Sequence, residues 1–395
     1  MRKRVIVLAH EATNSGAPLV LLDLLCWITS RYADRFEFRL IFQRGGELLE
    51  KFRRIAPVRV LHRLDPRSGR LAAFLSRRLV DRRMVARMRL RRAAAASSVT
   101  EKDLIYANTA SVGWMLSEVV RPKSKVLVHV HERAASFRRF ATPADLEKLV
   151  AAATRYVCVS ESVRSDLATV AGFDLNRATV VRNWVLRRTE PACSRAAARH
   201  ELTAQLGVPP DTWIVGGVGH LDPIKGPDRF IEMAAQLVAR TAKEAVAFAW
   251  IGDRGEKWYE AALRCHVFRL GLAGRVHFLG GRSDPRPFLC ACDAIAICSR
   301  KEGASLVLLE AAQADVPAVV FAGSGGPEEF ASGGGAGIVE DNDVIAMASL
   351  LARWRQSPEA ARRVARLAAE KLGKDHDREQ QCARLVDELL RLERS

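Results

Sequence analysis

The sequence has no apolar run long enough to cross a membrane as a helix, which takes about 20 residues. The apolar stretch near its start, from Val5 to Ala9, follows basic residues and is too short for the hydrophobic region of a signal peptide. Internal repeats and low-complexity segments are not evident either. We therefore expect a cytoplasmic protein, with peripheral attachment to the inner face of the membrane left open.

Metal-binding and dinucleotide-binding patterns are also missing. The eight cysteines are scattered, their one close pair is Cys290 and Cys292, and no C-x2-C spacing suits zinc. We interpret them as buried thiols in a reducing compartment. The loop from Glu11 to Pro18, which follows the first predicted strand, lacks a G-x-G-x-x-G fingerprint. We accordingly expect neither a metal ion nor a bound cofactor.

Acidic residues are in short supply, with 45 against 62 basic residues and a formal net charge of +17. This balance favours an anionic partner, such as nucleic acid, a membrane surface or a phosphorylated substrate. Nucleic acid is disfavoured because the basic residues are dispersed and no nucleic-acid-binding module is recognisable. The length of 395 residues favours two domains over one.

Short apolar runs alternate with helical patterns along the whole chain, which predicts α/β domains with parallel sheets. The expected domains are residues 1–185 and 199–372, joined by a weakly patterned linker at 186–198 and followed by a helix within 373–395. In the second half the expected helices are at about 227–239, 256–270, 284–291 and 304–314, and the strands are Trp213–Val218, Ala247–Ile251, Arg275–Leu279, Ala294–Cys298 and Ala318–Phe321.

The most informative stretch runs from Ser299 to Glu310. Two carboxylates, Glu302 and Glu310, stand there with seven residues between them. Glu302 lies in the loop that follows a buried strand, and Glu310 lies in an apolar helix expected to begin near Ala304. Burying the charge of Glu310 is costly unless it has a partner. That partner is either a ligand hydroxyl or an arginine elsewhere in the chain.

Two further elements flank this stretch in the sequence. Upstream, an apolar strand runs into V-G-H-L-D-P-I-K-G at 218–226, and downstream a glycine turn, G-S-G-G-P-E-E, occupies 323–329. Together with the E-x7-E stretch, these elements resemble the C-terminal half of the retaining nucleotide-sugar glycosyltransferases with the GT-B fold, family 4 in particular. The resemblance covers most of residues 212–340.

The resemblance implies two Rossmann-like domains that face each other across a cleft, with a terminal helix packing back on the first domain. It also implies a nucleotide-sugar donor (UDP-, GDP- or similar) as co-substrate. The implied activity is retaining, metal-independent sugar transfer to a glycan or lipid-linked acceptor in cell-surface polysaccharide biosynthesis. Two alternatives stay open, a sugar-nucleotide epimerase of the same fold and a non-catalytic nucleotide-sugar-binding protein.

On the donor side, the leaving diphosphate needs fixed positive charge and N–H donors. Lys225 is the best candidate cation, and His220 stands where the family has an arginine. By resemblance, Glu310 binds the ribose hydroxyls and Glu302 lies near the transferred sugar. Further donor-binding candidates are the backbone amides of Ser305, Leu306 and Val307, together with Gly326 and Glu329. Ordinary roles remain open: a surface lysine for Lys225, a capping side chain for His220 and a surface charge for Glu329.

On the acceptor side, Gly16 lies in a small-residue loop that faces the donor diphosphate and the acceptor in the family. His131 is at the end of a predicted strand, where the family carries a histidine followed by an acidic residue, and we expect it to be a catalytic-site residue. The turn at Asn183 resembles the family's N-G-V-D, with Trp184 in place of glycine.

An arginine-rich segment, residues 67–92, carries interleaved apolar residues in an imperfectly amphipathic pattern. One hypothesis is that it holds anionic lipid headgroups through Arg77, Arg78, Arg82 and Arg83. The other is that it is a solvated basic helix.

Overall fold

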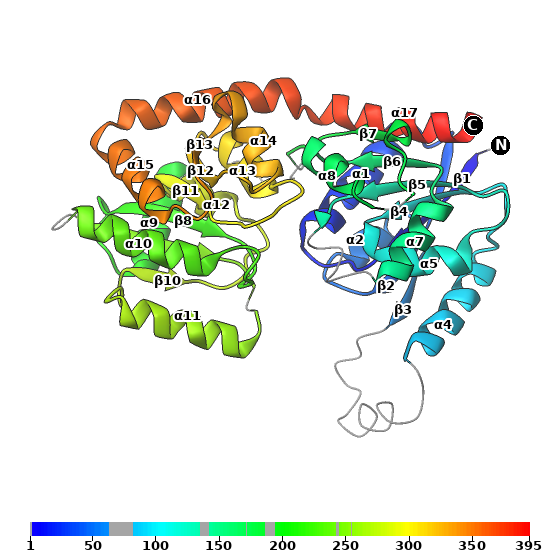
Figure 1. The fold of residues 1–395 in the computed structure, drawn as a ribbon, viewed down its shortest axis with the longest axis horizontal. Coiled ribbons are helices and arrows are strands. Elements are labelled where there is room, and N and C mark those ends of the chain that lie inside the picture. The colour runs from blue at the N-terminus through cyan, green and yellow to red at the C-terminus, as the bar shows by residue number, and fades with distance from the viewer. Residues whose placement is uncertain are drawn as a thin grey trace. The chain divides into compact units, whose positions relative to one another are not determined.

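The computed structural model describes residues 2–62, 82–134, 142–170, 172–185, 194–241, 245–253 and 255–395, without the side chains of 62 and 82–85. The chain divides into two compact units (Figure 1). The first unit comprises Met1–Leu186 and Arg378–Ser395, and the second comprises Arg187–Asp377. Among the described residues, no helix has both the length and the apolarity that a membrane span requires.

The first unit is built on a seven-stranded parallel sheet in the order β3-β2-β1-β4-β5-β6-β7. Its central strands are buried along nearly their whole length, as parallel strands covered on both faces must be. Val5 is paired with Phe38 on one side and with Leu104 on the other. The strands are β1 (Lys3–Ala9), β2 (Phe36–Arg44), β3 (Val58–His62), β4 (Leu104–Asn108), β5 (Lys125–Val130), β6 (Arg155–Cys158) and β7 (Ala178–Val180).

Helices α7 and α8 of this unit begin at side-chain caps. Thr142 and Asp145 form a capping box at the start of α7, and the Ser160 hydroxyl accepts the amide of Val163 at the start of α8. α5 packs against α4 and α7, whereas α17 packs against α1, β5 and β6. The described helices are α1 (Gly16–Arg31), α2 (Leu49–Arg53), α4 (Arg82–Ala96), η1 (Ala110–Val112), α5 (Gly113–Val119), α7 (Pro143–Ala152), α8 (Glu161–Leu167), η2 (Leu175–Arg177) and α17 (Arg378–Arg394).

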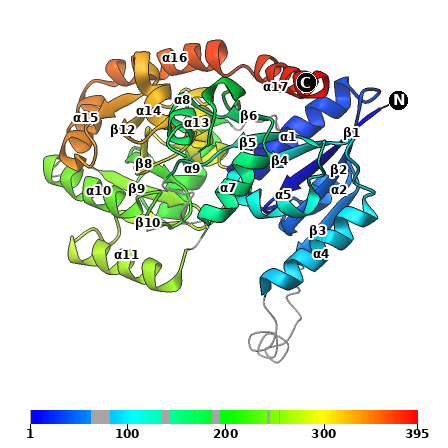
Figure 2. The same ribbon diagram turned by 45° about the vertical axis from the view of Figure 1, so that its right-hand side comes forward.

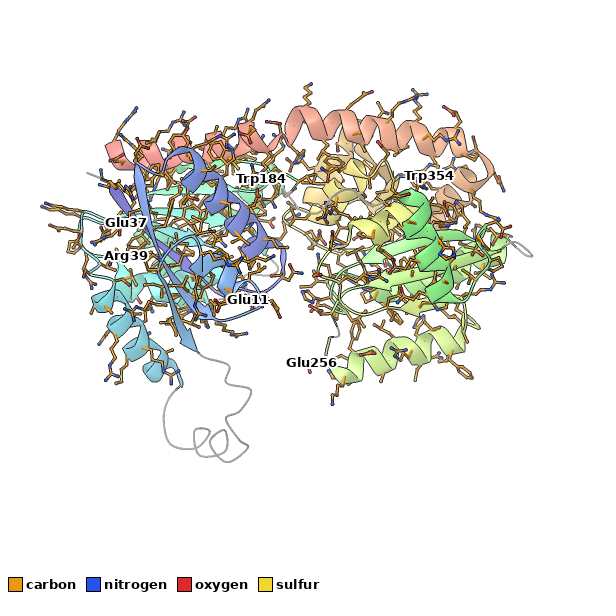
Figure 3. All side chains as sticks on the ribbon, turned by 180° about the vertical axis from the view of Figure 1, so that it is seen from behind. Glu11, Glu37, Arg39, Trp184, Glu256 and Trp354 are labelled. Atoms are coloured by element: carbon orange, nitrogen blue, oxygen red, sulfur yellow. The ribbon has the colours of Figure 1, made fainter. Side chains whose placement is uncertain are left out.

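The terminal helix α17 is held in the first unit by buried polar contacts. Arg378 donates to the carboxylate of Asp23 on α1, with Nε 2.7 Å from Oδ2. The same carboxylate accepts the indole N–H of Trp184 at 2.7 Å, which satisfies a fully buried tryptophan (Figure 3). Farther along α17, the buried Glu388 accepts from Arg155 at 2.6 Å. Each buried carboxylate therefore has a cationic partner, which offsets the cost of removing its charge from water.

The second unit has a six-stranded parallel sheet in the order β10-β9-β8-β11-β12-β13. The five strands expected in this half are all present. β13 was not expected, because its three residues follow a glycine-rich run that carries no strand pattern. The strands are β8 (Trp213–Val218), β9 (Val246–Ile251), β10 (Val276–Phe278), β11 (Ala294–Ile297), β12 (Ala318–Phe321) and β13 (Gly337–Val339).

The helices of the second unit pack against one another. α10 packs against α11 and α15 (Figure 2). α12 packs against α9 and α13, and both α13 and α15 pack against α16. α9 begins within the range expected to be linker, and α14 begins within the expected glycine turn. The helices are α9 (Arg195–Leu206), α10 (Pro227–Thr241), α11 (Lys257–Arg269), α12 (Arg286–Ala291), α13 (Leu306–Gln313), α14 (Gly326–Phe330), η3 (Ala331–Gly335), α15 (Val344–Gln356) and α16 (Pro358–Asp375).

Each sheet reverses its strand order once, between β1 and β4 in the first unit and between β8 and β11 in the second. The two loops that leave such a neighbouring pair run in opposite directions, which opens a crevice at the carboxyl ends of the strands. Two parallel-sheet domains of this type confirm the predicted α/β fold class with two Rossmann-like domains.

Candidate active site

The loop between β8 and α10 holds Lys225 in a defined turn. Asp222 organises it: its carboxylate accepts the amide of Ile224 at 2.8 Å, and its carbonyl accepts the amide of Lys225 at 3.0 Å. Gly226 then has φ +71°, and a Cβ there would lie 2.1 Å from the carbonyl oxygen of Cys298. Only glycine permits the lysine loop to approach the end of β11 so closely.

The loop after β11 is tied to the same turn from the other side. The amide of Arg300 donates to the carbonyl of Ile224 at 2.8 Å, and its guanidinium binds both carboxylate oxygens of Asp228 on α10. Burial alone would raise the pKa of Asp228, but the hydrogen bond and charge of Arg300 outweigh burial and lower it. The loop after β11 is thus tied to the start of α10 by a charged, bidentate contact.

Lys225 and Glu302 meet as an ion pair at this point, although they are 77 residues apart in the sequence. The lysine ammonium donates to Oε1 of Glu302, and the hydroxyl of Ser299 donates to the same oxygen at 2.6 Å. Glu302 is only 7% exposed, and its other oxygen, Oε2, is buried without a hydrogen-bond partner among the described residues. One carboxylate oxygen is therefore saturated while the second still lacks a donor.

The glycine turn expected at 323–329 lies directly against Glu302. The Glu302 amide donates to the carbonyl of Ser324 at 2.8 Å, and the amide of Gly326 returns a bond to the Glu302 carbonyl at 3.0 Å. A Cβ on Gly326 would lie 2.1 Å from the carbonyl oxygen of Gly303, so this position also requires glycine. Gly326 is the first residue of α14, and Glu329 lies half-buried on that helix.

Helix α13 begins at Leu306, two residues later than expected, because Ser305 keeps an extended backbone and acts as the N-cap. The Ser305 side chain makes no capping hydrogen bond. The first-turn amides, including that of Val307, are therefore not satisfied by this cap. Glu310 lies in the second turn of α13 and is 6% exposed, so the expected burial of its carboxylate is found.

His220 is placed differently from the charged pair. Its imidazole is half-exposed, and Nδ1 lies 3.8 Å from a carboxylate oxygen of Asp253, which follows β9. Its described side-chain contact is therefore with Asp253 rather than with Lys225 or Glu302. Gly16 is exposed at the first position of α1, in the first unit.

In the first unit, His131 lies at the carboxyl end of β5 beside two other histidines. Its ring packs on that of His129, with ring centres 4.1 Å apart, and His129 Nδ1 is 2.6 Å from the buried hydroxyl of Tyr106. Burial lowers the pKa of His129 to about 3. Burial also lowers the pKa of His131 well below its usual range, helped by the nearby His129 and His10. Both imidazoles are consequently neutral near pH 7.

Asn108, at the end of β4, determines which nitrogen of His131 carries the proton. The Asn108 side-chain NH₂ donates to the carbonyl of Ala17 at 3.4 Å, so its oxygen faces His131. That oxygen lies 3.2 Å from Nε2 of His131 and accepts its N–H. Nδ1 of His131 is then the nitrogen with the free lone pair.

Sequence reasoning missed the residues that support the expected ones: Asn108, Asp222, Asp228, Ser299 and Arg300. The signals available were weak. Ser299 begins the E-x7-E stretch and Asn108 ends a strand, but neither position indicates which side chain it will contact. Arg77 and Arg78 of the basic segment lie outside the described residues, as do the side chains of Arg82 and Arg83. In the described part of the chain, no group of three or more histidines, cysteines or carboxylates could hold a metal ion.

A comparison of the sequence with known protein families finds a match within the second unit. Residues 198–371 match the family described as "Glycosyl transferases group 1". The chain therefore carries a glycosyl transferases group 1 domain, and the predicted resemblance to GT-B glycosyltransferases of this type is confirmed.

The individual relatives that match the chain are also named as glycosyltransferases. A D-inositol 3-phosphate glycosyltransferase of Salinispora tropica is 30% identical over 295 residues, which is 69% of this chain and 60% of the relative. A protein of the same name from Gordonia bronchialis is 27% identical over 72% of this chain and 66% of its own length. For several other relatives of this name, the chain spans about half the length of the curated protein it matches.

Solved structures extend the likeness to both units as a fold. Anabaena Alr3699/HepE, crystallised with UDP and glucose, superposes with a TM-score of 0.78 at 22% identity and covers 98% of this chain and 99% of its own. Sucrose-phosphate synthase of Thermosynechococcus elongatus gives a TM-score of 0.74 at 16% identity, with 99% of each chain covered. At these identities the likeness shows the fold alone.

Proposed function

We propose that this protein is a retaining glycosyltransferase that moves a sugar from a nucleotide-sugar donor to a glycan or lipid-linked acceptor in cell-surface polysaccharide biosynthesis. The observation that carries the proposal is the state of Glu302. Its Oε1 accepts from Lys225 and Ser299, whereas its buried Oε2 has no described partner. A buried acceptor without a donor costs about 1–3 kcal/mol, and a hydroxyl of the transferred sugar is a donor that removes this cost.

The departing nucleoside diphosphate would be stabilised by the groups around Lys225. Negative charge builds on the diphosphate as the sugar bond breaks, so cations and N–H donors fixed at that place lower the barrier. Lys225 is partly exposed and anchored by the Asp222 turn. The amides of Ser305, Leu306 and Val307, at the N-terminus of α13, add partial positive charge. No divalent ion is needed in this scheme.

The remaining donor-side residues are assigned to the nucleoside and to the shape of the pocket. Glu310, buried in the second turn of α13, would accept both ribose hydroxyls with one carboxylate. Gly326 brings the glycine turn against Glu302, and Glu329 follows on α14. His220 takes the place of an arginine as a weaker, pH-dependent contact to the diphosphate.

On the acceptor side, His131 and the Gly16 loop would position the hydroxyl that attacks the sugar. The neutral imidazole of His131 offers the lone pair of Nδ1 as a hydrogen-bond acceptor, because Asn108 engages Nε2. In front-face transfer, the sugar C1–O bond to phosphate breaks while a new C1–O bond forms on the same face. Because the new bond forms on the face from which the phosphate leaves, the configuration at C1 is retained, and the acceptor proton passes to the departing phosphate oxygen.

The test is a panel of UDP-, GDP- and other nucleotide sugars, measured for binding, hydrolysis and transfer. Acceptors should include glycans, a lipid-linked sugar and inositol phosphate, since several relatives are named for that substrate. NMR of the product decides the anomer. Donor conversion that needs no acceptor would identify an epimerase, binding without turnover would identify a non-catalytic protein, and an inverted anomer would exclude the retaining mechanism.

Location and membrane contact belong to the same proposal. A cytoplasmic enzyme peripheral on the inner face of the membrane would meet a lipid-linked acceptor there, and the net charge of +17 favours an anionic surface. That Arg77, Arg78, Arg82 and Arg83 hold anionic lipid headgroups stays a prediction.

A further inference from the structure

Helix α11 presents an apolar stripe to solvent. Trp258, Ala261, Ala262, Cys265 and Phe268 follow one another at helical spacing, so they share one face. Trp258 is 68% exposed, Phe268 is 77% exposed, and the three smaller residues are exposed as well. Isolated exposed apolar side chains are ordinary, but two aromatic rings on a continuous apolar face mark an interaction surface.

The opposite face of α11 already supplies the packing that the fold needs. Leu263 and Val267 are buried in the core of the second unit, and the helix contacts α10. The hydroxyl of Tyr259 lies 3.3 Å from a carboxylate oxygen of Asp228, which anchors the first turn. Of the outward stripe, Trp258 makes an edge-on ring contact within α11 itself, with Tyr259 at 5.5 Å between ring centres.

The charged residues on the outward face of α11 itself are basic. Lys257, Arg264 and Arg269 are exposed on the same side of α11 as the apolar residues. Glu260 lies toward the buried side and is paired with Arg264, with Nη2 2.8 Å from Oε1. Glu256 precedes the helix as its N-cap residue (Figure 3). The outward face thus combines aromatic rings with cations and carries no acidic residue.

We propose that α11 docks the second unit on the surface of an anionic lipid bilayer. Trp258 and Phe268 enter the headgroup region, where aromatic rings are favoured, and Lys257 and Arg269 contact anionic headgroups. A second copy of this chain fits less well, because pairing two such faces would set cations against cations. The 13 residues of α11 give a contact about 20 Å long.

Vesicle sedimentation tests the proposal with the full chain. Wild type should sediment with phosphatidylcholine vesicles that contain phosphatidylglycerol and much less with phosphatidylcholine alone. The double variant Trp258→Ser/Phe268→Ser should bind about tenfold more weakly or worse, since it loses most of the inserted apolar area. Lys257→Gln and Arg269→Gln should each cost about fivefold, on anionic vesicles only.

Matched controls separate this surface from general stickiness. Ile345→Ser removes another exposed apolar side chain, 52% exposed on α15, and Arg362→Gln/Arg363→Gln removes two cations from α16. Both controls should bind as wild type does. Circular dichroism melting and binding of the nucleotide sugars should be unchanged in every variant, because α11 lies outside the proposed donor-site residues.

Three results would overturn the proposal. Wild type that ignores anionic vesicles would end it outright. A Trp258→Ser/Phe268→Ser variant that sediments like wild type would assign attachment to other residues, such as 77–83. A wild type that is dimeric by light scattering, with that variant monomeric and lipid binding unaffected, would assign the face to a second copy. None of these outcomes depends on whether the protein transfers sugar.

Discussion

The two sheets reverse their strand order at equivalent points, but different side chains follow the strands there. In the second unit, the loops after β8 and β11 place an ammonium and a carboxylate together, Lys225 and Glu302. In the first unit, the ends of β4 and β5 place Asn108 against a neutral imidazole, His131. A parallel sheet thus determines where a site can form, while the loop residues determine whether it is charged.

The two sites differ in charge because burial acts on their side chains in different ways. In the second unit the buried charge of Glu302 is matched by the ammonium of Lys225, and Asp222, Ser299 and Arg300 hold the pair in place. In the first unit burial removes the charge instead, by lowering the pKa of His129 and His131. Under the proposed function, the charged group of the second unit would face the diphosphate, and the neutral imidazole of the first unit would face the acceptor hydroxyl.

The largest effect is expected when the cation of the second unit is removed. Lys225→Met should lower turnover by about 10²–10³-fold, the loss typical of removing one group that stabilises developing charge. It should also weaken the binding of a nucleoside diphosphate more than the binding of the corresponding nucleoside, as measured by calorimetry. Lys301→Met is the control, because this exposed lysine donates to the carbonyl of Gly323. Equal losses in the two variants would remove Lys225 from the site.

A somewhat smaller effect should separate the two carboxylates of the E-x7-E stretch. Glu310→Ala should raise the donor dissociation constant by about 10- to 100-fold, as expected for losing hydrogen bonds to a charged group. Glu302→Ala should act mainly on kcat. Initial-rate kinetics and donor titrations measure both, with the exposed Glu340→Ala as control. If both variants kept wild-type transfer, the assignment of the donor site would be wrong.

Acid should destabilise the first unit through its buried histidines. The unfolded chain binds a proton on His129 below about pH 6.5, whereas the folded protein resists it down to about pH 3. Stability contributed by this group is therefore full above pH 6.5 and falls as the pH is lowered. Between about pH 6.5 and pH 5 the loss is roughly 2 kcal/mol, measured by urea unfolding.

The variant His129→Gln isolates this contribution, because glutamine does not titrate. Its stability should fall less between the same two pH values than that of wild type. His131 should act in the same direction, since its pKa is also lowered. An unchanged pH dependence in His129→Gln would mean that this imidazole is not buried in its neutral form.

The smallest effect is expected at Asn108. Asn108→Asp should raise the pKa of His131, because a carboxylate favours the imidazolium, and should move the acid limb of kcat/KM up by about one pH unit. Asn108→Leu should lower kcat without moving that limb, and Asn176→Asp, exposed in η2, should change neither. An Asn108→Asp enzyme with the wild-type pH profile would show that Asn108 does not control His131.

The local sequence predicted most of the elements and indicated that the E-x7-E stretch and the glycine turn lie together. Apolar runs such as Ala318–Phe321 became strands with the expected bounds, since a strand covered on both faces needs little beyond its own hydrophobicity. The E-x7-E stretch and the glycine turn were expected near one pocket, and Glu302 does contact Gly326. Helix α13 begins at Leu306, two residues after the predicted start, because Ser305 has an extended backbone and is the N-cap.

By itself, the sequence determined the alternation of strands and helices and the resemblance to a glycosyltransferase family, since these follow from periodicity and short motifs. Only the tertiary structure decided that Lys225 meets Glu302, that Arg378 reaches Asp23 across 355 residues, and that His131 is neutral. Those outcomes depend on which distant side chains share a dry environment. Local patterns do not encode that information, because burial and pairing arise only when the whole sheet has formed.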